Sequence, residues 1–388
     1  MLIYVVIALL LIIPLFFKQE QSSHKYDGYY WFEFCVLFLL MGLRFRVGGD
    51  SLRYEMYFSY AKDLSELFVK GAWDLSEGFQ PLWTLYQAAC KTITDDFVIV
   101  QLVNSFVLNG VIFYCAAKEV RHRFTFVVLY YFLYYPYFNT EIMRESLAVA
   151  MFIVGYRFLV NGNYVKYYLI CVVAFMFHAS AIFLMVLPVM YPFLSKSRGW
   201  KSYLVPIVFA LVVSYYVSFI LEILNSTLFL DNALLGDKSE SVLQSEGLNV
   251  FGIIGQLACL FPLFFCMYIS QKRGKKSDLF ILNMYFFVSI IGMVYLPLVR
   301  LANYFIIPFL YIYSDMILNP EILRKYRPIV NLSVCLLLYS RLSYYCQGMA
   351  STEGRSKEFY MYDIYIPYHS VFDKEYDMKR ERAIELQF

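Results

Sequence analysis

Ionisable side chains at the ends of apolar stretches are the residues of this sequence that could carry chemistry. Two apolar helices, Arg144–Val160 and Lys166–His178, are predicted on either side of a tight polar turn, Asn161–Asn163. At ~1.5 Å per residue the arms span roughly 24 Å and 18 Å, close to the ~30 Å of a bilayer core. An antiparallel hairpin of such arms brings Arg144 and His178 to the same membrane face. A guanidinium and an imidazole at the edge of the hydrocarbon are costly, which indicates a functional site.

Further arginines at comparable positions suit an anionic ligand. Arg44, Arg46 and Arg53 lie in the segment GLRFRVGGDSLRYEMYF, and Arg300 follows a proline-containing end of another apolar run. A guanidinium binds phosphate through two hydrogen bonds, stays charged and sheds water more readily than an ammonium group. We therefore expect these four arginines and Arg144 to bind a phosphate-containing ligand. The alternative is that some of them form structural ion pairs with Asp50, Glu55, Glu141 or Glu145.

Three further residues are candidates for proton transfer or for sugar contacts. A lone histidine in an apolar stretch is more often a buried, hydrogen-bonded residue, but His178 lies beside Ser180 at a predicted helix break. Histidine titrates near neutral pH and can accept a proton from a hydroxyl group. Asp50 follows a Gly-Gly turn that could approach a ligand closely, and is either a base or an arginine partner. Glu77 either caps the next helix or contacts a sugar.

The composition places these residues in an integral membrane protein. Of the 388 residues, 60% are hydrophobic and 16% are charged, whereas a soluble domain carries about 25% charged residues. The mean hydropathy is +0.56, and apolar stretches recur along the whole chain. The net charge of +3 is too small to indicate a nucleic-acid partner. The eight cysteines form neither a CxxC pair nor a Cys/His ligand spacing, so we expect no disulfide framework and no metal site.

The fold class expected is therefore an all-α polytopic membrane protein with about twelve transmembrane helices. One helical domain covers residues 1–345, with outer loops at 44–96 and 222–248, and a polar tail at 346–388 is expected on the outer side. Besides the hairpin and two spans that flank the basic loop Gln271–Lys276, the sequence predicts helices at Leu2–Phe17, Tyr29–Leu43, Phe97–Ala117, Phe124–Phe138, Ile182–Leu194, Tyr203–Leu221, Leu301–Ile317 and Ile329–Tyr345.

The distribution of basic loops predicts the orientation. If the short apolar stretch Phe79–Ile93 is a re-entrant or interfacial helix, the basic loops fall on one side, which is then cytoplasmic, and both termini lie outside. If Phe79–Ile93 crosses the membrane, the charge bias is split. In the first arrangement the five arginines and His178 all map to the outer face, against the charge rule. Their shared exception to that rule suggests a single site.

The order of several segments resembles the EpsG family of Wzy-type polysaccharide polymerases. These segments are GLRFRVGGDSLRY, SEGFQPLW, FNTEIMRESLAVAMF with Arg144, FMFHASAIFL with His178, LVRLANYF with Arg300, and the terminal YIPYHSVFD. The resemblance covers nearly the whole chain. One departure is visible, because the family's usual Arg-Gln pair is Arg144-Glu145 here.

The resemblance implies a GT-C-like membrane glycosyltransferase that needs neither a metal nor another cofactor. Such an enzyme would join repeat units carried on undecaprenyl diphosphate at the outer face of the bacterial cytoplasmic (inner) membrane. The arginines would hold the diphosphate as it leaves, and His178 or Asp50 would accept a proton from the attacking sugar hydroxyl. The expected partners are the lipid-linked oligosaccharide, membrane lipid and a chain-length regulator protein.

Two other classes would share these residues. A flippase for the same lipid-linked oligosaccharide would also need arginines for phosphate, but it should carry charge through the membrane midplane and show inverted repeats. The charges of this sequence collect at one face instead. An O-antigen-ligase-like transferase or an acyltransferase would share both the histidine and the arginines.

Overall fold

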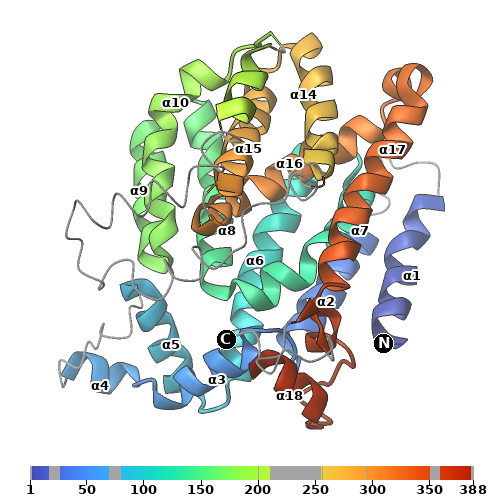
Figure 1. Ribbon diagram of the computed structural model, residues 1–388. Coiled ribbons are helices and arrows are strands. Elements are labelled where there is room, and N and C mark those ends of the chain that lie inside the picture. The colour runs from blue at the N-terminus through green and yellow to red at the C-terminus, as the bar shows by residue number, and fades with distance from the viewer. Residues whose placement is uncertain are drawn as a thin grey trace, which may run out of the picture. The chain divides into compact units, whose positions relative to one another are not determined.

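The apolar runs of the sequence form helices in the computed structural model of the protein (Figure 1). The structure describes residues 2–16, 27–69, 80–199, 201–209, 255, 257–294, 296–349 and 359–385. Within these residues the chain is helical apart from its loops and one short antiparallel pair of strands. The chain divides into two compact units, of which the first comprises Met1–Pro188, Leu310–Arg327 and Leu338–Phe388, and the second Val189–Phe309 and Pro328–Leu337.

The helices of the first part of the chain are α1 (Leu2–Phe16), α2 (Asp27–Gly42), α3 (Ser51–Tyr60), α4 (Leu64–Val69), α5 (Pro81–Ile93), α6 (Val98–Glu119), α7 (Arg123–Leu133), the π-helix η2 (Tyr137–Glu141), α8 (Met143–Val160), α9 (Tyr164–Phe177), the 3-10 helix η3 (Ala179–Val186) and α10 (Leu187–Leu194). Helices α3, α4 and α5 lie together at one end of the long helices α6, α8 and α9 (Figure 1).

The elements that follow are α14 (Phe261–Arg273), α15 (Lys276–Val294), η4 (Leu296–Ala302), α16 (Asn303–Ile317), α17 (Pro320–Tyr345), the strands β1 (Gly348–Met349) and β2 (Phe359–Tyr360), η5 (Met361–Ile364) and α18 (Met378–Glu385). The two strands pair antiparallel, with Gly348 opposite Tyr360. Residues 201–209 are helical, whereas the rest of the predicted helix Tyr203–Leu221 and the loop at 222–248 lie outside the described residues.

The predicted hairpin is confirmed as helices α8 and α9, which pack against each other. Gly162 has φ +71°, which makes the turn between the arms tight. The side chain of Asn163 caps α9 by accepting a hydrogen bond from the backbone N–H of Lys166 at 3.4 Å. A Cβ atom at Gly155 would lie 3.0 Å from the Ile170 side chain, so glycine permits close packing of the arms.

Polar contacts from α6 fix the start of α8. Asn104 donates a hydrogen bond to the carbonyl oxygen of Met143 at 2.9 Å. One turn further along α6, Asn109 donates to Asn139 at 2.8 Å and accepts from the hydroxyl of Tyr130 at 3.0 Å. Asn104, Asn109 and Asn139 are all buried. A buried amide network of this kind specifies one arrangement of its helices, and here it fixes η2 and the first turn of α8 against α6.

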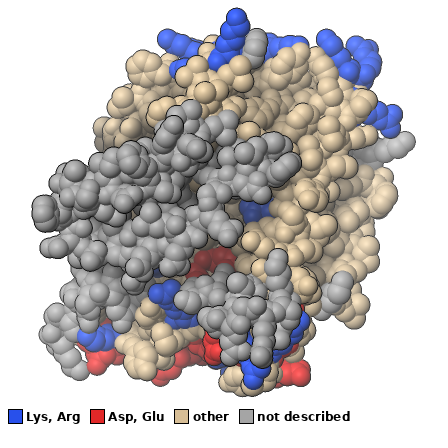
Figure 2. Space-filling model, in the orientation of Figure 1, with Lys and Arg blue, Asp and Glu red and all other residues tan. Residues whose placement is uncertain are grey.

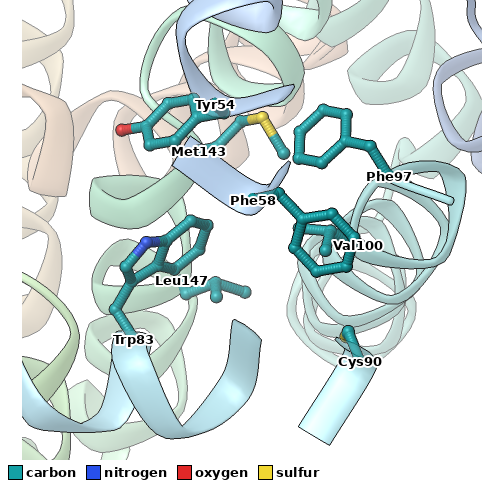
Figure 3. Packing of buried hydrophobic residues seen from close by; sticks show 8 residues of the cluster. All are labelled: Tyr54, Phe58, Trp83, Cys90, Phe97, Val100, Met143 and Leu147. Atoms are coloured by element: carbon teal, nitrogen blue, oxygen red, sulfur yellow. The ribbon is translucent and has the colours of Figure 1, made fainter. Parts of the chain in front are cut away.

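An aromatic cluster joins α3, α5, α6 and α8 at the same end of the first unit (Figure 3). Trp83 is fully buried and its ring packs at 5.5 Å from that of Tyr54. Met143 and Leu147 of α8 belong to this cluster, and Phe177, the last residue of α9, packs against it. The cluster therefore holds the beginning of α8 and the end of α9 at the same place, as the antiparallel hairpin predicts.

The predicted polar tail contains a folded segment, residues 359–385, which we call the C-terminal segment. It packs against the loop after α2, where Phe45 N–H donates to His369 O at 2.8 Å and Gly48 N–H donates to Ile364 O at 2.9 Å. Val47 lies with Ile364 and Ile384 in a second buried cluster. These contacts join residues that are more than 300 positions apart in the sequence.

In the second unit, α14 and α15 form a hairpin around Gly274, which has φ +70°. Asn283 of α15 accepts a hydrogen bond from Tyr203 at 2.9 Å and donates one to Leu194 O at 2.6 Å. A Cβ atom at Gly292 would lie 2.8 Å from the Val299 side chain. Glycine at this position therefore lets η4, which carries Arg300, lie directly against α15.

The membrane-span prediction has partial support from the described residues. By length and composition, Val98–Glu119 qualifies as a membrane-crossing helix. A bent pair of helices, Leu298–Ile317 and Pro320–Tyr345, would give a second span if the two are counted as one, and they meet at an angle of 105°. Shorter apolar helices are Leu2–Phe16, Arg123–Leu133, Tyr164–Phe177 and Ala179–Leu194. About twelve spans, and the re-entrant reading of α5, stay predictions.

Candidate functional site

Arg144 lies in the first turn of α8, where the backbone N–H groups of a helix and its dipole favour anions. Its half-buried guanidinium donates through Nε to the hydroxyl of Tyr54 at 3.1 Å and through Nη1 to the amide oxygen of Gln80 at 3.5 Å. The same guanidinium lies 6.0 Å from the centre of the Tyr54 ring. The hydrogen bonds to Tyr54 and Gln80 thus fix the orientation of the planar guanidinium group of Arg144.

His178 caps the C-terminus of α9, in extended backbone conformation (φ −152°, ψ 131°). Its Nδ1 lies 2.7 Å from the hydroxyl oxygen of Ser180 and 3.4 Å from the backbone nitrogen of Ser180, whose N–H donates to Nδ1 when that atom carries no proton. With the proton on Nε2, the neutral ring is a hydrogen-bond donor toward a ligand. With the proton on Nδ1, which then donates to the Ser180 hydroxyl, Nε2 can accept a proton instead.

The aromatic cluster brings the neighbourhoods of Arg144 and His178 together. Met143 and Leu147 flank Arg144 on α8, and Phe177 immediately precedes His178. Tyr54, which contacts Arg144, belongs to the same cluster (Figure 3). Arg144 and His178, the candidates for anion binding and proton transfer, therefore lie at one end of the first unit.

Arg44 is buried and is bound by the protein itself. It is 1% exposed, and its guanidinium donates to the backbone carbonyl oxygens of Val47 (3.1 Å) and Met41 and to the sulfur of Met143 (3.3 Å). Burial lowers the pKa of the Arg44 guanidinium to about 10. Arg44 therefore connects the loop between α2 and α3 to the start of α8.

Arg46 joins the loop to the C-terminal segment. Its guanidinium binds both carboxylate oxygens of Glu381, each at 2.7 Å, and one oxygen of Glu55 at 2.9 Å. The hydrogen bonds that Arg46 donates to Glu381 raise the pKa of Arg46. Arg46 has φ +52°, a strained value for a residue with a side chain. The ion pairs to α3 and α18 hold it in that conformation.

Arg53 and Asp50 lie at the start of α3, and Asp50 occupies the N-cap position. Arg53 is exposed and donates to the hydroxyl of Tyr57 at 3.2 Å, a bond that raises the pKa of its guanidinium. Asp50 is half-buried, and its negative charge also raises the pKa of Arg53. The two side chains are therefore electrostatic neighbours on one turn.

The Gly-Gly turn approaches the protein rather than open space. Gly48 has φ +99°, and a Cβ atom there would lie 2.2 Å from the Thr140 side chain. The N–H of Gly49 donates to the carboxylate of Glu141 at 2.7 Å, and the Tyr365 hydroxyl donates to the same oxygen at 2.9 Å. Burial, reinforced by Glu141, raises the pKa of Tyr365. Glu141 therefore joins η2 to the turn and to the C-terminal segment.

Two predicted site residues are not placed with the others. Arg300 is exposed on η4 of the second unit, so its association with Arg144 stays a prediction. Glu77 lies outside the described residues. At the α3, α5 and α18 end of the first unit, acidic and basic side chains are intermixed on the visible face (Figure 2).

The structure adds Arg341, which is not among the predicted site residues. Its guanidinium stacks 3.9 Å from the centre of the Tyr134 ring and lies 5.6 Å from that of Tyr137 and 5.7 Å from that of Tyr344. Such stacking holds a guanidinium in place while its N–H groups point outward in the plane. The signal was available, because Arg341 is a lone charge in the apolar last predicted helix. Tyr54 and Gln80 likewise lie within motifs of the family resemblance.

Comparison with known proteins identifies the family. No curated protein and no solved structure matches the chain. A family model matches residues 27–370, which include every predicted site residue and most of the described helices. The match also extends into the C-terminal segment that packs against the loop of Arg44 and Arg46. This chain therefore belongs to the EpsG family.

Proposed function

We propose that this protein is a polysaccharide polymerase of the bacterial cytoplasmic (inner) membrane. It transfers a growing glycan from a lipid diphosphate, undecaprenyl diphosphate in the form we propose, onto a lipid-linked repeat unit. Membership of the EpsG family supports a role in exopolysaccharide synthesis and, with it, glycosyltransferase activity. The proposal further includes a GT-C-like arrangement of about twelve spans, with the active site on the outer face and a chain-length regulator as a protein partner.

The observation that carries the proposal is the setting of Arg144. Its guanidinium is half-buried, oriented by Tyr54 and Gln80, and placed at a helix N-terminus. A diphosphate matches this setting, because a guanidinium can bind two of its oxygens while the helix end stabilises further negative charge. A neutral substrate would gain less from such a group, because a guanidinium binds an anionic oxygen more strongly than a neutral one.

The proposed reaction is a direct glycosyl transfer that needs no metal. The hydroxyl oxygen of the acceptor sugar attacks the anomeric carbon of the donor glycan and forms the new glycosidic bond. The bond between that carbon and the diphosphate oxygen breaks, and the lipid diphosphate leaves as an anion held by Arg144 and Arg300. The proton of the acceptor hydroxyl goes to Nε2 of His178, in the tautomer whose Nδ1–H donates to the Ser180 hydroxyl oxygen. Asp50 is the second candidate for this base.

The proposal is tested with purified protein in proteoliposomes that contain a lipid-linked repeat unit. A polymerase converts this single substrate into a ladder of products that differ by one repeat unit, and releases lipid diphosphate. A flippase would move the substrate across the bilayer without any ladder, and a ligase would transfer glycan only when a different acceptor is added. In a deletion strain, we expect loss of long polymer with single repeat units retained at the outer surface.

A further inference from the structure

A small cavity lies beside the loop of Arg44 and Arg46, at the N-terminal end of α6. Its volume is about 60 Å³, and its walls come from residues 44–46, α3, residues 96–101 and Lys374 of the C-terminal segment. One water molecule needs only ~10–15 Å³ of such space. The cavity therefore has room for a larger polar group, such as a hydroxymethyl group or the edge of a sugar ring.

One wall of the cavity carries a buried acceptor. Gln101 is 3% exposed, and its amide oxygen Oε1 accepts no hydrogen bond from any residue that the structure describes. An amide oxygen that has left water without gaining a donor is unfavourable. A ligand that brings a hydrogen-bond donor into the cavity would remove this cost. Gln101 is therefore the group that the occupant of the cavity is expected to contact.

The charges of the lining restrict the chemistry of the occupant. Three basic and two acidic side chains line the cavity, and most of this charge is compensated within the protein. Arg46 pairs with Glu55 at 2.9 Å, and Lys374 lies 3.6 Å from Asp96. Because neither sign of charge prevails, a free phosphate or a metal cation gains little here. A neutral ligand rich in hydroxyl groups can use the charged groups as donors and acceptors together.

We propose that this cavity binds a sugar of the acceptor repeat unit, with Gln101 Oε1 accepting a hydrogen bond from a sugar hydroxyl. Phe45 and Phe97 add apolar surface to the lining, which suits the C–H face of a sugar ring. The inference rests on the proposed function, because the polymerase reaction supplies the repeat unit as ligand. It assigns the acceptor glycan to the part of the first unit that the loop, α3 and the C-terminal segment enclose.

The test uses full-length protein in detergent and the repeat-unit oligosaccharide released by mild acid from the producing strain's own polysaccharide. Binding is measured by calorimetric titration for the wild type and for Gln101→Leu, which removes the acceptor oxygen. Gln101→Glu keeps an acceptor oxygen at the same place. Gln87→Leu is the matched control, because Gln87 of α5 is also buried, has an amide nitrogen without a partner among the described residues, and does not line this cavity.

We expect Gln101→Leu to weaken binding about tenfold or more, while Gln101→Glu and Gln87→Leu stay near the wild type. Equal affinity in the wild type and Gln101→Leu, or no binding to the wild type, overturns the inference and leaves the cavity to water. An unchanged KM for the acceptor in a Gln101→Leu protein that still polymerises would overturn the inference and keep the proposed function. Oligosaccharide binding that depends on Gln101, in a protein that makes no ladder of products, would support the inference about the cavity and overturn the proposed function.

Discussion

Arg44 and Arg144 carry the same side chain and lie close to the same residue, Met143, yet their surroundings give them different uses. The guanidinium of Arg44 is 1% exposed and donates to backbone carbonyl oxygens of its own loop. The guanidinium of Arg144 is half-buried and is oriented by two side chains from α3 and the start of α5. Ligand binding needs an oriented guanidinium that a ligand can reach, so Arg144 is the better candidate of the two.

Arg144 should therefore be sensitive to the shape of its side chain as well as to its charge. We expect Arg144→Lys to lose polymerisation nearly as completely as Arg144→Ala, about 100-fold or more, because an ammonium cannot form the bidentate contact. The measurement is the rate of ladder formation from a synthetic lipid-linked repeat unit. Arg324→Lys, at an exposed arginine in the loop expected on the cytoplasmic side, serves as a control for a general effect of the substitution. Near-normal activity of Arg144→Lys would contradict the proposal that Arg144 binds the diphosphate through two hydrogen bonds.

His178 is expected to act through its basicity. His178→Gln keeps a polar group of similar size that can still bond to Ser180, so the protein should fold and bind donor lipid as before. Loss of a positioned base should lower turnover by about 10²–10⁴-fold. Single-turnover rates and donor affinity are measured separately. Wild-type turnover in His178→Gln at matched protein amounts would leave the histidine with only its capping role on α9.

At the scale of elements, the C-terminal segment holds the loop that the sequence motif GLRFRVGGD forms. Arg46 bonds to Glu381 of α18 and to Glu55 of α3, but the two carboxylates differ in their electrostatics. Burial raises the pKa of Glu55 more than Arg46 lowers it. The ionised form of Glu55 is therefore penalised in the folded protein relative to the unfolded chain.

We expect Glu381→Gln to destabilise the protein by about 1.5–3 kcal/mol, the usual contribution of a hydrogen bond to a charged group. Glu55→Gln should behave differently with pH. A carboxyl with a raised folded pKa contributes stability below its unfolded pKa of about 4.3, and loses it as pH rises through the folded value. Thermal unfolding midpoints in detergent at pH 4 to 7.5 should therefore shift in favour of Glu55→Gln as pH increases. A shift in favour of the wild type would show that the ion pair outweighs burial.

The hairpin was predictable from sequence because its signals are local. The expected helix Arg144–Val160 is observed as Met143–Val160, and Lys166–His178 as Tyr164–Phe177. Apolar runs and an Asn-Gly-Asn turn are sufficient to define such ends. The second partner of Arg46 was not predictable in this way, because Glu381 is 335 positions away. Nothing local in a polar segment indicates which distant loop it will cover.

At the scale of the whole molecule, the charge pattern predicts the side of the membrane on which the site lies. The start of α8 follows the outer end of the preceding apolar run in that prediction, and the Asn161–Asn163 turn lies on the cytoplasmic side. The loops at Lys118–Arg123, Lys166 and Arg324–Arg327 are expected on that side as well. A lipid diphosphate donor at the outer surface requires Arg144 and His178 on the opposite side.

Accessibility of single cysteines in intact cells tests this topology, in a background from which the eight native cysteines have been removed. Cysteines in place of Ser65, Ser239 and Ser356 should react with a membrane-impermeant thiol reagent, because these positions are expected outside. A cysteine in place of Ser277, beside the basic loop Gln271–Lys276, should react only after the membrane is opened. Labelling of position 277 together with protection of position 239 would invert the predicted orientation of the later spans. Labelling of 65 together with protection of 239 and 356 would instead show that α5 crosses the bilayer, because one added crossing reverses every loop that follows it.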